Sequence, residues 1–303
     1  MSEPTIIDTK MHGFADITAV YLIEDEKIAL VETGPKNRVD NVLAGLAEAG
    51  VDRLDWIVVT HIHLDHAGAA GTLAQKFPEA TIAVHEVGAP HLIDPTKLWA
   101  SAARIYGDRM EEMWGGIDPI PEERIQLLTD GAKIDLGGRT LQAIETPGHA
   151  RHHHAFLDDS TGILFTGDAL GVRLPDVGVI RPATPPPEFN LEDAITSIRR
   201  LEEVSPAALW PTHFGPADRG AKVKSIPDTC AEAVASMEQW AGWVRAARAE
   251  TDDLDNATEQ VQAQARAHLE ERLSPEQVGR MEQTTSYRMN VSGYMRYFDK
   301  LER

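Results

Sequence analysis

The sequence is nearly free of cysteine: Cys230 is the only one in 303 residues. A single cysteine excludes an internal disulfide bond and any zinc site built from several thiolates, and it is typical of a reducing compartment. Any transition-metal site in this chain must therefore use histidine and carboxylate ligands.

Long apolar runs and an excess of basic residues are also missing. No stretch approaches the roughly 20 apolar residues that a membrane-spanning helix needs. The N-terminal stretch MSEPTIIDTKMHGF has no basic region followed by an apolar segment and a cleavage site, so we expect a cytoplasmic protein. The 29 Lys and Arg residues face 48 Asp and Glu residues, and the net charge of −19 repels polyanions. We therefore expect a small-molecule substrate, with no nucleic-acid and no membrane partner.

Strand-like and helix-like stretches alternate as far as about residue 225. AVYLIED and KIALVET predict a β-hairpin, and LDWIVVT and TIAVHE predict buried strands. VDNVLAGLAEAGV, PTKLWASAARIYGDRMEEMW and NLEDAITSIRRLEEV predict amphipathic helices. Three later strand-like stretches end on residues that can bind a metal, namely His149, Asp168 and His213.

The composition changes near residue 225. From about Asp228 the chain is rich in Ala, Glu, Gln and Arg and poor in Gly, which predicts helices. We therefore predict a catalytic domain over residues 1–225 and a helical C-terminal extension over residues 226–303. The extension would either cap the first domain or form the subunit boundary of a homodimer, because its helices carry several large apolar side chains: Trp240, Trp243, Tyr287, Tyr294, Tyr297 and Phe298.

The stretch THIHLDHAGAAG contains four potential metal ligands within six positions: His61, His63, Asp65 and His66. Imidazole nitrogens together with a carboxylate oxygen suit zinc, iron or manganese. On an extended or tightly turned segment His61 and His63 share one side, whereas Asp65 and His66 follow the bend and can face a second ion. Solvated loop histidines with a helix-capping aspartate explain this density poorly. We therefore predict a metal site here.

The stretch THIHLDH resembles the His-x-His-x-Asp-His signature of the metallo-β-lactamase superfamily, and TPGHA, FTGDA and PTHFGP resemble its later ligand motifs. The resemblance covers about residues 15–220. It implies an α/β (α+β) fold, an αββα sandwich of two mixed β-sheets flanked by helices, with the metal centre where strand ends converge. It also implies seven ligands: His61, His63 and His149 for the first ion, Asp65, His66 and His213 for the second, and Asp168 between them.

A hydrolase of the glyoxalase II and lactonase type is the function that this resemblance implies. Its cofactors would be two divalent transition-metal ions, with zinc expected first and iron or manganese as the alternatives. Such a pair would lower the pKa of a shared water, and the resulting bridging hydroxide would attack the substrate. The candidate catalytic residues are Asp65, which would relay a proton to the leaving group, and Asp168, which would neutralise part of the doubled charge.

Departures from the family's subgroups narrow the substrate. Metallo-β-lactamases proper generally lack the bridging aspartate that Asp168 supplies, and Cys230 lies outside every metal motif. ALGVRLPDVG after Asp168 lacks the glycine, cysteine and arginine stretch usual in glyoxalase II, and flavin-linked diiron members carry glutamate in place of His63. We expect lactones, thioesters or carboxylic esters as substrates, with weak phosphotriester hydrolysis. The alternatives are a glyoxalase II-type thioesterase and a non-catalytic metal-binding regulator of the same fold.

Several residues near these motifs have two interpretations. Glu32 stands where the family commonly has aspartate before Thr-Gly, and it either supports the ligands or ends a surface strand. We expect His152 to His154 to support the site rather than to bind metal. Arg173 and Arg181 would orient a substrate carboxylate or form surface salt bridges.

Four side chains at helical spacing either line an apolar pocket or belong to the core: Trp99, Tyr106, Met110 and Trp114.

Overall fold

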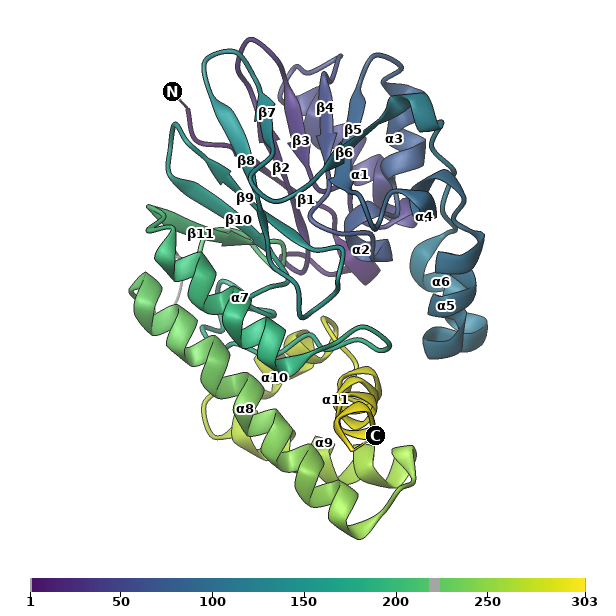
Figure 1. The fold of residues 1–303 in the computed structure, drawn as a ribbon, viewed down its shortest axis with the longest axis vertical. Coiled ribbons are helices and arrows are strands. Elements are labelled where there is room, and N and C mark those ends of the chain that lie inside the picture. The colour runs from purple at the N-terminus through teal and green to yellow at the C-terminus, as the bar shows by residue number, and fades with distance from the viewer. Residues whose placement is uncertain (1, 218–223, 303) are drawn as a thin grey trace.

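Two mixed β-sheets pack face to face in the computed structural model, which describes residues 2–217 and 224–302 (Figure 1). The first sheet runs in chain order: β1 (Thr5–Asp8), β2 (Ala19–Ile23), β3 (Ala29–Val31), β4 (Trp56–Val58), β5 (Thr81–His85) and β6 (Ile125–Leu128). Its first three strands are antiparallel, as the predicted hairpin requires, and β3 to β6 are parallel.

The second sheet has the order β11-β10-β9-β8-β7. Its strands are β7 (Lys133–Asp135), β8 (Thr140–Glu145), β9 (His154–Asp158), β10 (Ile163–Gly167) and β11 (Ala208–Pro211). Only the β10–β11 pair is parallel. Both sheets are therefore mixed, and the predicted αββα sandwich is confirmed.

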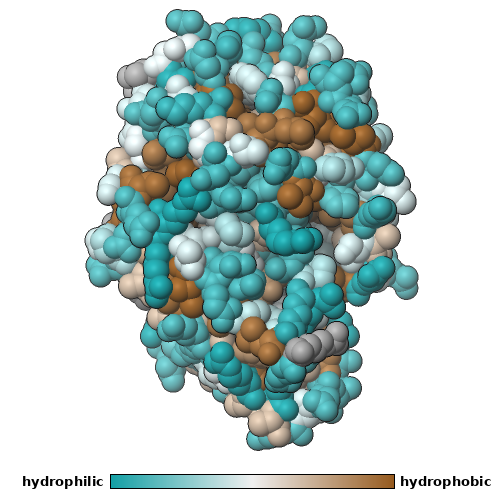
Figure 2. Space-filling model, in the orientation of Figure 1, coloured by the Kyte–Doolittle hydropathy of each residue, from teal (hydrophilic) through white to brown (hydrophobic). Residues whose placement is uncertain are grey.

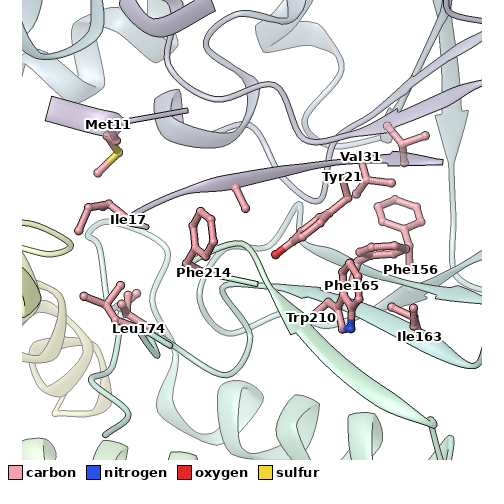
Figure 3. Packing of buried hydrophobic residues seen from close by; sticks show 14 of the residues in the cluster. Met11, Ile17, Tyr21, Val31, Phe156, Ile163, Phe165, Leu174, Trp210 and Phe214 are labelled. Atoms are coloured by element: carbon pink, nitrogen blue, oxygen red, sulfur yellow. The ribbon is translucent and has the colours of Figure 1, made fainter. Parts of the chain in front are cut away.

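Aromatic and aliphatic side chains fill the space between the sheets (Figure 3). The Tyr21 ring lies 5.1 Å from the Phe165 ring and 5.4 Å from the Trp210 ring, centroid to centroid, so β2 contacts two strands of the other sheet. Side chains alternate along the strands, as a sheet buried on both faces requires. In β4, Val58 belongs to this core, whereas Ile57 packs with the helices on the outer face.

Helices cover the outer faces of both sheets (Figure 1). The first sheet is covered by α1 (Val39–Glu48), α2 (Leu64–Ala67) and α3 (Ala70–Lys76), and the second by α7 (Leu191–Glu203). Between β5 and β6 lie α4 (Pro90–Ile93), α5 (Thr96–Tyr106) and α6 (Met110–Trp114). The single helix predicted here is broken at Gly107, whose φ of 57° requires a residue without a Cβ. Four short 3-10 helices lie between the strands and helices of the first sheet: η1 (Met11–Gly13), η2 (Lys36–Arg38), η3 (Gly107–Arg109) and η4 (Glu122–Arg124).

The C-terminal region consists of four helices: α8 (Ile226–Glu250), α9 (Leu254–Glu270), α10 (Pro275–Glu282) and α11 (Tyr287–Leu301). Each begins after a side chain that accepts a hydrogen bond from the first turn, supplied by Ser225, Asp253, Ser274 and Ser286. The large apolar side chains of α8 and α11 pack in one cluster with α7 and the outer face of the second sheet, whereas Leu269 of α9 and Val278 and Met281 of α10 join the cluster that includes the core between the sheets. The extension therefore packs on the sandwich of its own chain.

The surface is largely polar. Figure 2 shows hydrophilic residues over most of the face drawn in Figure 1, with apolar residues scattered among them. Among the described helices, none has both the length and the apolar character needed to cross a bilayer.

Candidate metal centre

The seven residues predicted as ligands meet at one edge of the sandwich, where strand ends converge. His61 and His63 follow β4, and α2 carries Asp65 and His66. The other three come from the second sheet: His149 between β8 and β9, Asp168 directly after β10, and His213 two residues after the end of β11. Residues far apart in sequence thus share one site because each ends or follows a strand.

Three imidazole nitrogens form the first group. His63 Nδ1 lies 2.9 Å from His61 Nε2 and 2.8 Å from His149 Nε2. All the ligand atoms of this group lie within 4.8 Å of one another. His63 therefore points its Nδ1 atom to the centre, whereas His61 and His149 point their Nε2 atoms.

Asp65, His66 and His213 form the second group, again with ligand atoms within 4.8 Å of one another. Asp65 Oδ2 lies 3.3 Å from His213 Nε2 and 3.6 Å from His66 Nε2. Asp168 stands between the two groups: its Oδ2 is 3.6 Å from His149 Nε2, and its Oδ1 is 3.3 Å from His66 Nε2. This is the position that a ligand shared by two ions requires.

The ring nitrogens that face away from the centre are held by oxygen atoms. His149 Nδ1 lies 2.9 Å from the Ala183 carbonyl oxygen, and His213 Nδ1 lies 2.9 Å from the Ile17 carbonyl oxygen. A carbonyl oxygen only accepts, so each of these rings donates from Nδ1 and keeps the Nε2 lone pair for the centre.

The donor set fits divalent transition ions. His66 Nε2 and Asp168 Oδ1 are buried and have no hydrogen-bond partner in the described chain, although only 3.3 Å separates them. Buried polar atoms without partners are costly, and a cation shared by a lone pair and a carboxylate oxygen removes that cost. Five histidines and two aspartates suit zinc, iron or manganese.

The protonation states of His61, His63 and Asp168 agree with metal binding. Burial opposes a charge on His66 and His213, but the facing Asp168 and Asp65 raise the pKa of both rings. Burial, helped by the neighbouring histidines, lowers the pKa of His61 and of His63 well below the usual value, so both rings are neutral with a free lone pair. Burial alone would raise the pKa of the Asp168 carboxyl, but the facing His66, His213 and His149 hold that pKa well below its usual range. Asp168 is therefore an anion at neutral pH.

Glu32 is a functional residue that the sequence left undecided. It is fully buried, and its Oε1 accepts hydrogen bonds from the Thr60 hydroxyl at 2.5 Å and the Thr212 hydroxyl at 2.9 Å. The same oxygen lies 2.9 Å from His66 Nδ1. Glu32 thus orients one candidate ligand and joins the segments that carry two others, and the interpretation as a surface strand end is wrong. Its place before Thr-Gly at the end of β3 was the available signal.

The neighbouring histidines have separate positions. His153 Nε2 accepts from the Asp168 backbone N–H at 3.1 Å, and its Nδ1 lies 2.7 Å from the Thr146 hydroxyl, so this ring positions Asp168. His152 lies at the rim, 3.4 Å from Glu188. His154 stacks on His85 at 4.5 Å.

A pocket of about 820 Å³ lies above the centre. Five of the seven candidate ligands line it, namely His63, Asp65, His149, Asp168 and His213. Trp114, Tyr106 and the exposed Phe14 and Val87 form apolar parts of its wall. Met110 packs in the core and the partly buried Trp99 packs against it, and neither lines the pocket. The predicted aromatic wall is therefore only partly correct.

The C-terminal helices reach this pocket. The connection between α10 and α11 contributes Thr284, Thr285 and Ser286 to the wall, and α11 contributes Met289. Arg173 and Arg181 do not line the pocket, and both are buried, so neither interpretation from the sequence holds for them.

Comparison with known proteins identifies relatives of the whole arrangement. A family model described as "Metallo-beta-lactamase superfamily" matches residues 13–213. A metallo-beta-lactamase fold-containing protein of Sulfurisphaera tokodaii is 31% identical over 207 residues, which is 67% of this chain and 74% of the relative. A crystal structure of an archaeal superfamily protein from Sulfolobus tokodaii superposes with a TM-score of 0.69 at 24% identity, covering 97% of this chain and 98% of that one.

Other relatives, which match a smaller share of this chain, have named activities. A hydroxyacylglutathione hydrolase of Aeromonas salmonicida is 32% identical over 155 residues, 50% of this chain and 46% of that protein. A coenzyme F420H(2) oxidase of Methanothermobacter marburgensis is 31% identical over 172 residues, 54% of this chain and 37% of the relative. A chain solved in a di-iron-bound form superposes with a TM-score of 0.50 at 25% identity, covering 66% of this chain and 88% of that one.

Proposed function

This chain belongs to the metallo-beta-lactamase superfamily, and we propose that it is a metal-dependent hydrolase of small ester-like substrates. The observation that carries the proposal is that five of seven convergent candidate ligands form the floor of a pocket large enough for a small molecule. A purely structural metal site is usually closed by protein ligands and has no such pocket.

His61, His63 and His149 would hold one ion and Asp65, His66 and His213 the other, with Asp168 shared. Bound divalent ions supply Lewis acidity, which acidifies water and polarises a carbonyl oxygen. Asp65 is the candidate for moving the proton, because its side chain is 17% exposed and lines the pocket, whereas that of Asp168 is 4% exposed.

We place lactones first, thioesters second and simple carboxylic esters third among the substrates, and we expect weak phosphotriester hydrolysis. The apolar wall at Trp114, Tyr106, Phe14 and Val87 favours a largely apolar body. Likeness to a hydroxyacylglutathione hydrolase supports a thioester. The oxidase likeness gives less support to a redox reaction, because His63 stands where flavin-linked diiron members carry glutamate.

The proposal is tested with purified protein loaded with zinc, iron or manganese in turn. We expect two ions per chain by elemental analysis and loss of hydrolysis after chelation. A panel of a lactone, a thioester, an aryl ester and a phosphodiester then ranks the substrates by kcat/KM. A preference for the phosphodiester of more than about 100-fold, or no hydrolysis with any metal, would overturn the proposal.

A further inference from the structure

We propose that a second cavity, bounded by α8, α9 and residues 179–181, binds a small monocarboxylate with an apolar body. The cavity has a volume of about 420 Å³ and shares no lining residue with the pocket above the metal centre. Its volume falls in the range of about 300–1,000 Å³ that is typical of small-molecule sites.

Arg181 supplies the charged group of this site. It lines the cavity, yet the whole residue is only 2% exposed. Its Nη1 donates to the Met281 carbonyl oxygen at 3.1 Å. Its Nε and Nη2 are buried without a hydrogen-bond partner, and no carboxylate of the described residues forms an ion pair with it. A buried cation without an anion is costly to the fold, so the position is one that a bound anion would stabilise.

The aromatic contacts of Arg181 do not use those two N–H groups. The guanidinium carbon lies 4.2 Å from the centre of the Tyr287 ring and 5.4 Å from that of the Trp240 ring. A cation–π contact uses the flat face of the guanidinium, whereas the N–H bonds lie in its plane. Nε and Nη2 are adjacent donors in that plane. They match the two oxygens of one carboxylate in a bidentate pair.

The remaining walls favour an apolar body. Trp240, Trp243, Leu269 and Ile180 line the cavity, and the Trp243 ring lies 6.0 Å from the His268 ring. Ligand entry is available at α8, where Ala235 and Gln239 are exposed.

The charge of Glu282 acts on Arg181, but Glu282 forms no ion pair with it and accepts a hydrogen bond from the Tyr287 hydroxyl at 3.0 Å. The charged groups that line the cavity also leave Arg181 available to an anion. The acidic lining residue, Glu232, is already paired with Lys224 at 2.7 Å, and the other charged lining residue, Arg272, is basic. One carboxylate on an apolar body that packs against the two tryptophans is therefore the ligand chemistry that this cavity selects.

Calorimetric titration of the metal-loaded protein with indole-3-acetate tests the site, with indole-3-acetamide as the uncharged match. We expect the acid to bind with a Kd below about 1 mM and the amide at least about tenfold more weakly. Arg181→Met removes the charge but keeps most of the volume, so it should preserve the fold and weaken the acid at least about tenfold. A Tm near that of the parent protein verifies the fold.

A second pair of variants leaves Arg181 intact. Ala235→Trp obstructs the exposed opening and should abolish binding. Ala231→Trp, at an exposed position of α8 that does not line the cavity, should leave it unchanged. Binding that survives both Arg181→Met and Ala235→Trp would place the acid elsewhere and overturn the proposal, as would a titration without binding. Because none of these measurements uses hydrolysis, failure here is separate from failure of the proposed activity.

Discussion

The metal centre and the Arg181 cavity both hold buried polar atoms without hydrogen-bond partners. The charge of the ligand that would satisfy these atoms is positive at the metal centre and negative at Arg181. At the metal centre the unpaired atoms are a ring nitrogen and a carboxylate oxygen, which a cation would satisfy. At Arg181 the unpaired atoms are two N–H donors of a guanidinium, which an anion would satisfy. The electrostatic character of each open atom thus indicates which class of ligand would complete the site.

The two regions also differ in how firmly their polar groups are held. Glu32, the Ala183 carbonyl oxygen and the Ile17 carbonyl oxygen each fix one imidazole of the metal centre. Arg181 is fixed by one hydrogen bond and by two aromatic faces. The metal centre is therefore preorganised by a surrounding layer of hydrogen bonds, whereas the second cavity is held mainly by packing.

Asp168→Ala should give the largest effect, because it removes the carboxylate that contacts both groups of ligands. We expect kcat to fall at least about 100-fold, as for other key electrostatic groups, and metal content to fall below two ions per chain. Steady-state kinetics and elemental analysis of the same sample measure both. Asp159→Ala, at an exposed residue between β9 and β10, serves as the control. Near-parental turnover with two ions bound would refute the bridging role.

Most of the metal centre could be predicted from the sequence because its candidate ligands lie in short motifs that follow strands. A strand that runs into His61, His63, Asp65 and His66 places these residues together regardless of the rest of the chain. The later ligands follow strands, and strand ends of a packed sandwich meet at one edge. Glu32 was left open because its burial depends on Thr60 and Thr212, which follow two different strands, β4 and β11.

The position of Arg181 could not be predicted for the opposite reason. Its surroundings come from α8, α10 and α11, which lie between about 50 and 110 residues further along the chain. No local sequence pattern predicts to which side of the loop after Asp168 the Arg181 side chain points. The general prediction of helices after Asp228 did not place the break between α10 and α11, and it is this break that brings Thr284 and Thr285 to the pocket wall.

Gly293→Ala tests how tightly the helical region is joined to the metal centre. A Cβ at Gly293, in α11, would lie 1.8 Å from the Thr184 carbonyl oxygen. Thr184 has little freedom to move, because its backbone N–H and hydroxyl both bond to Asn290. We expect a loss of about 1–3 kcal/mol in the free energy of unfolding, measured with urea. Ala183, the residue before Thr184, orients His149 through its carbonyl oxygen. A shift of this segment should therefore lower kcat as well. An unchanged unfolding midpoint would show that α11 can shift freely.

Trp114→Ala should have a smaller effect, confined to the substrate pocket. Trp114 lines the pocket, whereas Trp99, on the preceding helix, packs against the core outside it. We expect Trp114→Ala to raise KM for long acyl chains about three- to tenfold more than for short ones, through lost apolar contact. Trp99→Ala should lower stability without changing that ratio. If both variants shift the ratio equally, the pocket wall is not where the structure places it.

Gly242→Ala should have the smallest effect, and its sign is opposite to that of Gly293→Ala. Gly242 lies inside α8, is exposed, and has no atom within 4 Å of the place a Cβ would take. Alanine there restricts the unfolded chain and favours the helix, so we expect a gain of about 0.5–1 kcal/mol in the free energy of unfolding. Hydrolysis and indole-3-acetate binding should stay at parental values, because Gly242 lines neither cavity. The same Gly→Ala change in α8 and in α11 then distinguishes the two helices. In α8 it tests helix propensity alone, whereas in α11 it also tests the contact that holds the metal centre in place. A loss of stability at Gly242 as large as at Gly293 would mean that α8 is under a constraint that its contacts do not explain.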